Sequence, residues 1–160
     1  MSEEYQEVKD NIQFEESKII LRYFSGRADK FNYEGRRNFC VLIEDEKTAS
    51  DLRRIGWNIR AAKMKDPEDP QVWFLPVKVN YGSDYPPRIV MVTERGRRTL
   101  HEETVEMLDY VRIIKADLEV SPYNYDVRGE RGVSAYLQTM FVTVEESRFD
   151  EKYADVPTLD

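Results

Sequence analysis

The feature that most constrains the fold is the alternation of apolar and polar side chains along short segments. It is clearest over residues 114–120, where Ala116 and Leu118 alternate with Lys115 and Asp117. This period of two is typical of an antiparallel strand that buries one face and exposes the other. The longest alternating run covers residues 133–144. The chain therefore has to satisfy strand geometry over much of its length.

Further segments with the same pattern are separated by turn signals and by two helical patterns. Asp45 can cap a short helix that ends at Gly56, and Thr99 can start a second one. The turn signals lie at 66–70 and 82–87 and around Gly96, Gly129 and Gly132. The remaining predicted strands cover residues 19–24, 39–43, 57–62, 75–81 and 89–91.

Six or seven short strands with one or two short helices predict a mainly β fold. An antiparallel barrel or sandwich suits such a set, because closure protects the edges of the sheet. An OB-like barrel is one member of this class, and strand pattern alone does not separate it from other sandwiches. We predict a single OB-like β-barrel domain over residues 15–147. We expect an acidic N-terminal arm at 1–14 and an acidic C-terminal tail at 148–160, both flexible.

Charge is sorted by position along the chain. The first 17 residues carry six carboxylates against one lysine, and the last 20 carry six against two cations. Residues 18–140 have a net charge of +2, so the formal charge of -7 comes from the ends. An acidic isoelectric point therefore does not argue against nucleic-acid binding by the middle of the chain.

Several function classes are disfavoured. The chain has no run of 18 apolar residues, so we expect no membrane span, and its acidic start lacks the apolar region of a signal peptide. The one cysteine, Cys40, and the one histidine, His101, argue against a disulfide, a cysteine zinc site and a multi-histidine metal site. We expect no metal, no cofactor and no enzymatic activity.

Basic and aromatic residues are interleaved in several segments. Single-stranded nucleic acid requires both types, because cations contact phosphates and flat rings stack on unpaired bases. Structural explanations remain open, since many rings belong in the core and many cations on a solvated surface. The wider pattern includes Lys65, Phe74, Tyr85, Arg88, Arg131 and Tyr136. The candidate nucleic-acid-binding residues are Arg27, Lys30, Phe31, Tyr33, Arg36, Arg37, Trp57, Arg60, Lys63, Trp73, Lys78, Tyr81, Tyr123, Tyr125 and Arg128.

Several short motifs resemble a family of bacteriophage single-stranded DNA-binding proteins. The similarity extends from about residue 17 to about residue 153, and the motifs agree in order and spacing. They are Phe24-Ser25-Gly26, Lys30-Phe31-Asn32, 35–41, Gly56-Trp57-Asn58, 117–123, Val127-Arg128-Gly129 and 132–137. The resemblance implies an OB-type fold, sequence-tolerant binding of single-stranded DNA, a role in phage DNA replication or recombination, and no catalysis. It places the protein in the host cytoplasm.

The acidic C-terminal tail is a candidate site for partners. Replication or recombination proteins could bind it through Asp150, Glu151, Asp155 and Asp160. The chain ends in Leu159-Asp160, whereas many such binding proteins end in an aromatic residue. An exposed edge strand could also pair subunits into a homo-oligomer.

Two other classes of function stay open. One is a phage structural or host-inhibitor protein, a protein-interaction module whose acidic surface could mimic DNA. The other is an enzyme that uses its carboxylates, such as a nucleotide hydrolase. Binding to an oligonucleotide separates the leading class from the protein-interaction module, and activity with added Mg²⁺ and nucleotide would favour the enzyme.

Overall fold

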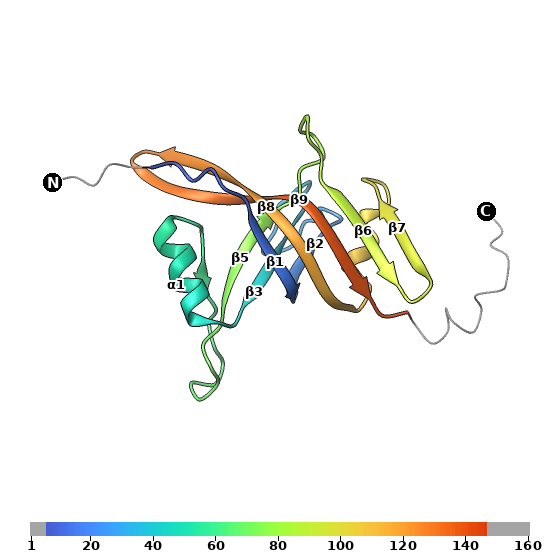
Figure 1. Cartoon of the computed structure of the whole chain (residues 1–160), viewed down its shortest axis with the longest axis horizontal. Helices are drawn as coiled ribbons and strands as arrows, with labels where there is room; N and C mark the ends of the chain where they lie inside the picture. Colours follow the sequence, from blue (N-terminus) through green and yellow to red (C-terminus); the bar gives the residue numbers. More distant parts are fainter. Residues whose placement is uncertain (1–5, 147–160) are drawn as a thin grey trace.

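A computed structural model describes residues 6–146, which form one strongly curved mixed sheet with a helix beside it (Figure 1). This mainly β, OB-like architecture confirms the predicted fold class. The helical elements are α1 (Glu46–Ile55) and the 3₁₀ turn η1 (Val105–Asp109). The strands are β1 (Ile12–Ser17), β2 (Ile19–Tyr23), β3 (Asn38–Ile43), β4 (Arg60–Ala61), β5 (Trp73–Lys78), β6 (Arg88–Thr93), β7 (Gly96–Leu100), β8 (Ile113–Val127) and β9 (Glu130–Val144).

Strand β9 lies at the centre of the sheet. It pairs antiparallel with β8 along nearly its whole length, and on its other edge it pairs in parallel with β5 and then with β6. The sequence predicts antiparallel strands, and the sheet is instead mixed. The reason is topological: the chain passes through β6, β7, η1 and β8 between β5 and β9, so that β9 returns in the direction of β5.

The two end strands of the sheet are consecutive in the chain. The order β1-β8-β9-β5-β3-β2 ends in β1 and β2, which are joined through Lys18. Each carries a register shift, and Glu16 and Leu21 there have positive φ values of 48° and 52°. These irregularities bend the segment, so that it leaves β8 and joins β3. The sheet is not closed by hydrogen bonds between β1 and β2. Its two end strands are connected only by the chain itself.

The β8–β9 hairpin turns through Arg128 and Gly129. Both residues have positive φ values, 53° and 84°, and the flanking Val127 and Glu130 are paired. A two-residue loop of this kind is a type I′ turn, whose twist matches that of the strands. The Asp126 side chain accepts a hydrogen bond from the Gly129 N–H at 3.1 Å.

The core lies against the concave face of the sheet. Alternate residues of β3, β5 and β8 point into it, as the sequence pattern predicts. In β9 the predicted face of Ala135, Leu137, Thr139 and Phe141 is wrong after Leu137: a register shift against β8 buries Met140 and Val142 in place of Thr139 and Phe141. The opposite set of side chains from these strands faces outward. The largest fully buried side chains are Phe24, Phe39, Leu75, Ile89, Leu100, Leu108 and Met140.

The largest differences from the predicted element boundaries occur in four places. Residues 12–14, assigned to the N-terminal arm, belong to β1. The expected strand at 57–62 is reduced to β4, because Trp57 forms a bridge to Val133 instead. No α-helix starts at Thr99, which pairs with Val90 in the unpredicted hairpin β6–β7. Strand β8 runs to Val127, well past its predicted end.

The bend at Leu21 gives a stability prediction. A residue with a Cβ pays roughly 1–2 kcal/mol for the left-handed region, a cost that glycine avoids. Leu21 is 57% exposed and loses little packing when replaced. We expect Leu21→Gly to be more stable than Leu21→Ala by about 1 kcal/mol in urea unfolding.

Ile20, in the same strand but outside the positive-φ set, is the matched control. There the order should reverse, with Ile20→Ala more stable than Ile20→Gly, since glycine weakens an ordinary strand. The same order at both positions would contradict a backbone constraint at Leu21.

Candidate nucleic-acid interface

The outward face of the sheet carries an ammonium group over a tyrosine ring. Lys78 of β5 and Tyr136 of β9 are partners in the parallel ladder, and the Lys78 Nζ lies 5.6 Å from the centre of the Tyr136 ring. Lys78 is exposed and Tyr136 is half-buried. The register thus sets a cation beside a flat aromatic surface at the middle of the sheet.

A groove adjoins Tyr136 on the β8–β9 ribbon. Tyr123 of β8 packs edge-on against Tyr136 with 5.8 Å between ring centres, and Tyr123 is 57% exposed. The Gln138 side chain donates a hydrogen bond to the Ser121 hydroxyl at 2.7 Å along the floor. We call this hollow of about 310 Å³ the tyrosine groove; it is lined by Asn80, Ser83, Tyr85, Ser121, Pro122, Tyr123, Tyr136, Leu137 and Gln138.

The same face continues toward β4. Arg60 of β4 pairs with Phe74 of β5. Pro76 and Lys78 follow Phe74 at alternate positions of β5, so all four side chains lie on the same side of the sheet. Cys40 lies opposite Pro76 on β3. Burial raises the pKa of the Cys40 thiol to about 11, and the nearby Arg60 charge acts in the opposite direction. The thiol is therefore neutral at pH 7, and Arg60 is the cation at this end.

The β2–β3 loop, residues 24–37, is held in shape by Asn32. The Asn32 amide is buried and donates to the carbonyl oxygens of Arg27 and Arg36 at 2.8 and 3.0 Å. Its oxygen accepts from the Asn38 side chain at 2.9 Å. Asn38 pairs with Lys78 in the β3–β5 ladder. Asn32 and Asn38 thus hold the loop next to Lys78.

A second anchor of this loop is Asp109. Its carboxylate is almost wholly buried and accepts hydrogen bonds from the Phe24 and Ser25 N–H groups at 2.7 and 3.0 Å. It also pairs with Arg27 at 2.8 Å. The Arg27 guanidinium lies 4.5 Å from the centre of the Tyr23 ring. Arg27 is a predicted site residue that the structure ties mainly to the loop's own support.

The loop presents two of the most exposed aromatic rings among the described residues. Phe31 is 87% exposed and Tyr33 is 74% exposed. The Arg36 guanidinium lies 5.0 Å from the centre of the Tyr33 ring, and Lys30 is also exposed. A fixed loop that presents rings and cations to solvent can bind a flexible polyanion without a large ordering cost.

Four of the predicted aromatic residues have structural contacts, and one of them, Trp57, is buried. Trp57 is only 3% exposed, and Trp73 and Tyr81 pack against the core. Tyr125 donates a hydrogen bond to Asn58 at 3.0 Å and covers Gly132. A buried ring cannot stack on a base, so Trp57 is a correction to the predicted site. Trp73, Tyr81 and Tyr125 are half-buried and stay predictions.

Arg37 is also mainly structural. It is half-buried, donates to the Phe24 carbonyl at 2.6 Å, and lies 5.6 Å from the centre of the Tyr81 ring. Its ion pair with Glu102 is long, at 3.9 Å. A guanidinium held in this way is poorly placed to follow a phosphate chain.

The remaining predicted residues lie apart from the groove or outside the description. Lys63 is exposed in the segment after β4, and Arg128 forms the tip of the β8–β9 hairpin. The predicted partner residues Asp150, Glu151, Asp155 and Asp160 lie outside the described residues. The face therefore brings together Arg60, Lys78 and Tyr123, with the loop residues Lys30, Phe31, Tyr33 and Arg36 beside them.

Sequence reasoning missed the two loop anchors, Asn32 and Asp109. Asn32 falls within a recognised motif but carries no chemistry that marks it, and Asp109 comes from a segment more than 80 positions away. Only the tertiary fold shows that they support the same loop.

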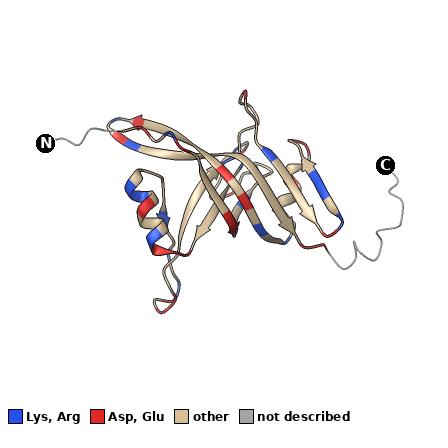
Figure 2. Ribbon diagram, viewed as in Figure 1, with Lys and Arg blue, Asp and Glu red and all other residues tan. Residues whose placement is uncertain are grey.

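Charge on the folded part is mixed (Figure 2). Both signs occur on α1, while β8 carries acidic residues in its middle and β7 carries basic ones. Within residues 6–146 no group of histidine, cysteine and carboxylate side chains has the arrangement of a metal site. The same part of the chain contains no helix long and apolar enough to span a membrane.

The sequence as a whole matches one family model. The model describes a putative phage ssDNA-binding domain, and the match covers residues 1–160. The chain therefore belongs to this phage ssDNA-binding family. No match was found among curated proteins.

Solved structures with the same fold come from bacteriophage Enc34. A C-terminally truncated single-stranded DNA-binding protein from this phage aligns with a TM-score of 0.53 and 10% identity, over 92% of this chain and 98% of that chain. The Enc34 protein in complex with ssDNA also aligns with a TM-score of 0.53 and 10% identity, over 91% and 96%. At this identity the likeness establishes the shared fold.

The burial of the Tyr81 hydroxyl can be tested by measuring the free energy of unfolding. Its hydroxyl is buried without a hydrogen-bond partner among the described residues, which costs about 1–3 kcal/mol. Tyr81→Phe should therefore raise the free energy of unfolding by about 1 kcal/mol and leave oligo-dT binding unchanged. Tyr125→Phe, which loses the bond to Asn58, should instead lower it by about 1 kcal/mol.

The pH dependence of stability provides an independent test of the burial of the Tyr81 hydroxyl. Burial raises the pKa of Tyr81 to about 12 from its ordinary value of 10.0. Between these values the unfolded chain loses the proton first, so stability falls as pH rises. Tyr81→Phe should reduce that fall in denaturant titrations from pH 10 to 12; an unchanged profile would contradict the burial of the hydroxyl.

Proposed function

We propose that this protein binds single-stranded DNA without strong sequence selection during phage DNA replication or recombination. The observation that carries the proposal is the Lys78–Tyr136 pair beside the tyrosine groove, on the outward face of a fold that belongs to a phage ssDNA-binding family. The described part offers rings and cations in one place, and its carboxylates show no metal-binding arrangement.

Bases and phosphates would use different parts of this face. Tyr123, Tyr136 and Tyr85 offer flat surfaces to unpaired bases, and each stacked base contributes roughly 1–3 kcal/mol. Lys78 and Arg60 lie at the same side of β4 and β5, where they can contact phosphates. Stacking tolerates any base, since every base has an aromatic face.

The β2–β3 loop would add a second contact region. Phe31 and Tyr33 project from a loop that Asn32 and Asp109 already hold in place. DNA binding then does not require the loop to fold first, which reduces the entropic cost of association. A strand that leaves the groove past Lys78 would meet these rings, because Asn38 joins the loop to Lys78.

The test is a titration of labelled oligo-dT and of duplex DNA, followed by fluorescence anisotropy at several salt concentrations. Wild-type protein should bind oligo-dT more tightly than duplex, with an affinity that falls as salt rises. Lys78→Gln should weaken binding and reduce the slope of log K against log salt by about 1.

The control is Lys47→Gln, which removes a lysine from the exposed side of α1 where it pairs with Asp51. Its salt slope should equal that of the wild type. Failure of wild-type protein to bind oligo-dT at low salt would refute the proposed function and favour a protein-interaction module. Equal slopes for the two variants would place the phosphate contacts elsewhere.

We assign the acidic end a regulatory part in the same function. Residues 147–160 contain Asp150, Glu151, Asp155 and Asp160 against two cations, and like charges compete with phosphates for a basic surface. They are also the proposed contact for replication or recombination proteins. For a homo-oligomer, the candidate surface is the edge of β7, which pairs only with β6 among the described strands.

Removal of residues 147–160 tests the competition. The truncated protein should bind oligo-dT more tightly than the full chain at low salt, and the two affinities should converge at high salt, where charge is screened. Equal affinities at low salt, measured by the same anisotropy assay, would show that the acidic end does not compete.

A further inference from the structure

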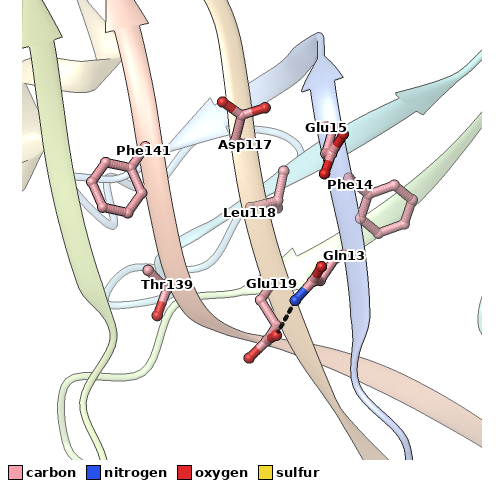
Figure 3. Close-up of a pocket in the computed structure, with 8 residues that line it drawn as sticks. All are labelled: Gln13, Phe14, Glu15, Asp117, Leu118, Glu119, Thr139 and Phe141. Carbon is pink, nitrogen blue, oxygen red and sulfur yellow. Dashed lines mark hydrogen bonds between the residues drawn. The ribbon is translucent and has the colours of Figure 1, made fainter.

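A second hollow lies on the outward face, further along the β8–β9 ribbon. It has a volume of about 310 Å³, at the lower end of the usual range of about 300–1,000 Å³ for ligand pockets. Figure 3 shows Thr139 and Phe141 of β9 on one side, and Gln13 and Glu15 of β1 on the other. We call it the Phe141 hollow; it is lined by Gln13, Phe14, Glu15, Asp117, Leu118, Glu119, Thr139 and Phe141.

The Phe141 hollow repeats the arrangement at the tyrosine groove. The Arg88 guanidinium lies 5.4 Å from the centre of the Phe141 ring, as Lys78 lies over Tyr136. In both cases the ring belongs to β9 and the cation to a parallel neighbour, β6 or β5. Arg88 is exposed and Phe141 half-buried. Each pair therefore offers one aromatic surface and one phosphate contact.

The two hollows follow one another along the same strands. Leu137 and Gln138 line the tyrosine groove, and Thr139 lines the Phe141 hollow directly after them on β9. On β8, Ser121 lines the first and Glu119 the second. Neighbouring strand residues are about 3.3 Å apart, so one flexible DNA chain can reach both hollows.

What distinguishes the Phe141 hollow is a pair of carboxylates beside the ring. Asp117 is directly opposite Phe141 in the β8–β9 ladder, and Glu119 is opposite Thr139. Figure 3 shows both carboxylates projecting from β8. Neither forms an ion pair with a cation of residues 6–146, so their acceptor capacity is not taken by a positive side chain there.

The hydrogen bonds of these carboxylates leave Asp117 with the freer oxygen. Asp117 Oδ1 accepts from the Glu16 N–H at 2.7 Å, and no described residue donates to its Oδ2. Glu119 accepts from the Gln13 and Asn11 side chains at 2.8 and 3.2 Å, and these bonds lower the pKa of its carboxyl group. Asp117 is therefore the better acceptor for a ligand.

We infer that the Phe141 hollow is a nucleobase subsite that prefers bases with an exocyclic amino group over thymine. The base would stack on Phe141, its phosphate would contact Arg88, and the amino group would donate to Asp117. Cytosine and adenine present an amino donor where thymine presents a carbonyl oxygen, which a carboxylate repels. The inference rests on the proposed function and adds a base preference to it.

The test compares oligo-dC with oligo-dT of equal length for wild-type protein and for Asp117→Asn, by fluorescence anisotropy. Wild type should bind oligo-dC more tightly by about 5-fold, the lower end expected for a hydrogen-bonded base contact. Asp117→Asn keeps the shape and an oxygen for the Glu16 N–H, but its amide can also donate to the thymine O4. The dC-to-dT ratio should therefore fall toward 1.

Two further variants make the result specific. Glu106→Gln removes an exposed carboxylate of η1 and should raise both affinities alike or leave both unchanged, with the wild-type ratio. Phe141→Leu keeps an apolar side chain but removes the ring, and should weaken binding of both oligonucleotides. Circular dichroism checks that each variant is folded.

The outcomes separate this inference from the proposed function. No binding of either oligonucleotide would refute both. Binding with equal affinity for oligo-dC and oligo-dT in wild type, or a ratio that Asp117→Asn leaves unchanged, would overturn the base preference and leave the proposed function standing. If Asp117→Asn does not fold, an unchanged affinity for both oligonucleotides in Phe141→Leu overturns the subsite.

Discussion

The antiparallel pairing of β8 with β9 is the constraint on which the rest of the structure depends. Its register sets Tyr123 beside Tyr136 and places Asp117 opposite Phe141. Because β8 occupies one edge of β9 for most of its length, only the other edge is free for β5 and β6. Those two parallel neighbours bring Lys78 and Arg88 to the rings of β9. One ladder thus determines both hollows, their spacing and their cations.

Local arrangement rather than net charge explains how an acidic chain can bind a polyanion. The formal charge is -7, and the +2 of residues 18–140 is too small to attract DNA over a distance. Affinity has to come from stacking on exposed rings and from a few cations held near them. The described surface offers such rings on the β2–β3 loop and in the tyrosine groove, and each region has a cation within contact distance of a ring. The proposed role of the acidic end has the same basis. Because the attraction between this surface and DNA is weak, nearby carboxylates can compete with it.

The sequence predicts the fold class well because strand alternation is a local property. Leu118 and Lys115 reveal their faces without any knowledge of the partner strand, and the motifs identify the family. Parallel pairing of β9 depends on the path of the chain between β5 and β9, which no local pattern contains. The same limit applies to the site: Lys78 and Tyr123 are recognisable by type and lie on the outward face, whereas Trp57 looks equally suitable and is 3% exposed. Burial of a ring is decided by tertiary packing, and so are the distant anchors Asn32 and Asp109.

The central claim is that single-stranded DNA lies along the outward face of β9. Photocrosslinking with oligonucleotides that carry 5-iododeoxyuridine tests it most directly, because the crosslinked residue is identified by mass spectrometry. The account predicts crosslinks at Tyr123, Tyr136 or Tyr85 of the tyrosine groove, together with Phe31 or Tyr33 of the loop, and their loss at high salt. Crosslinks confined to Tyr110, which is 78% exposed and lies outside both regions, would contradict it.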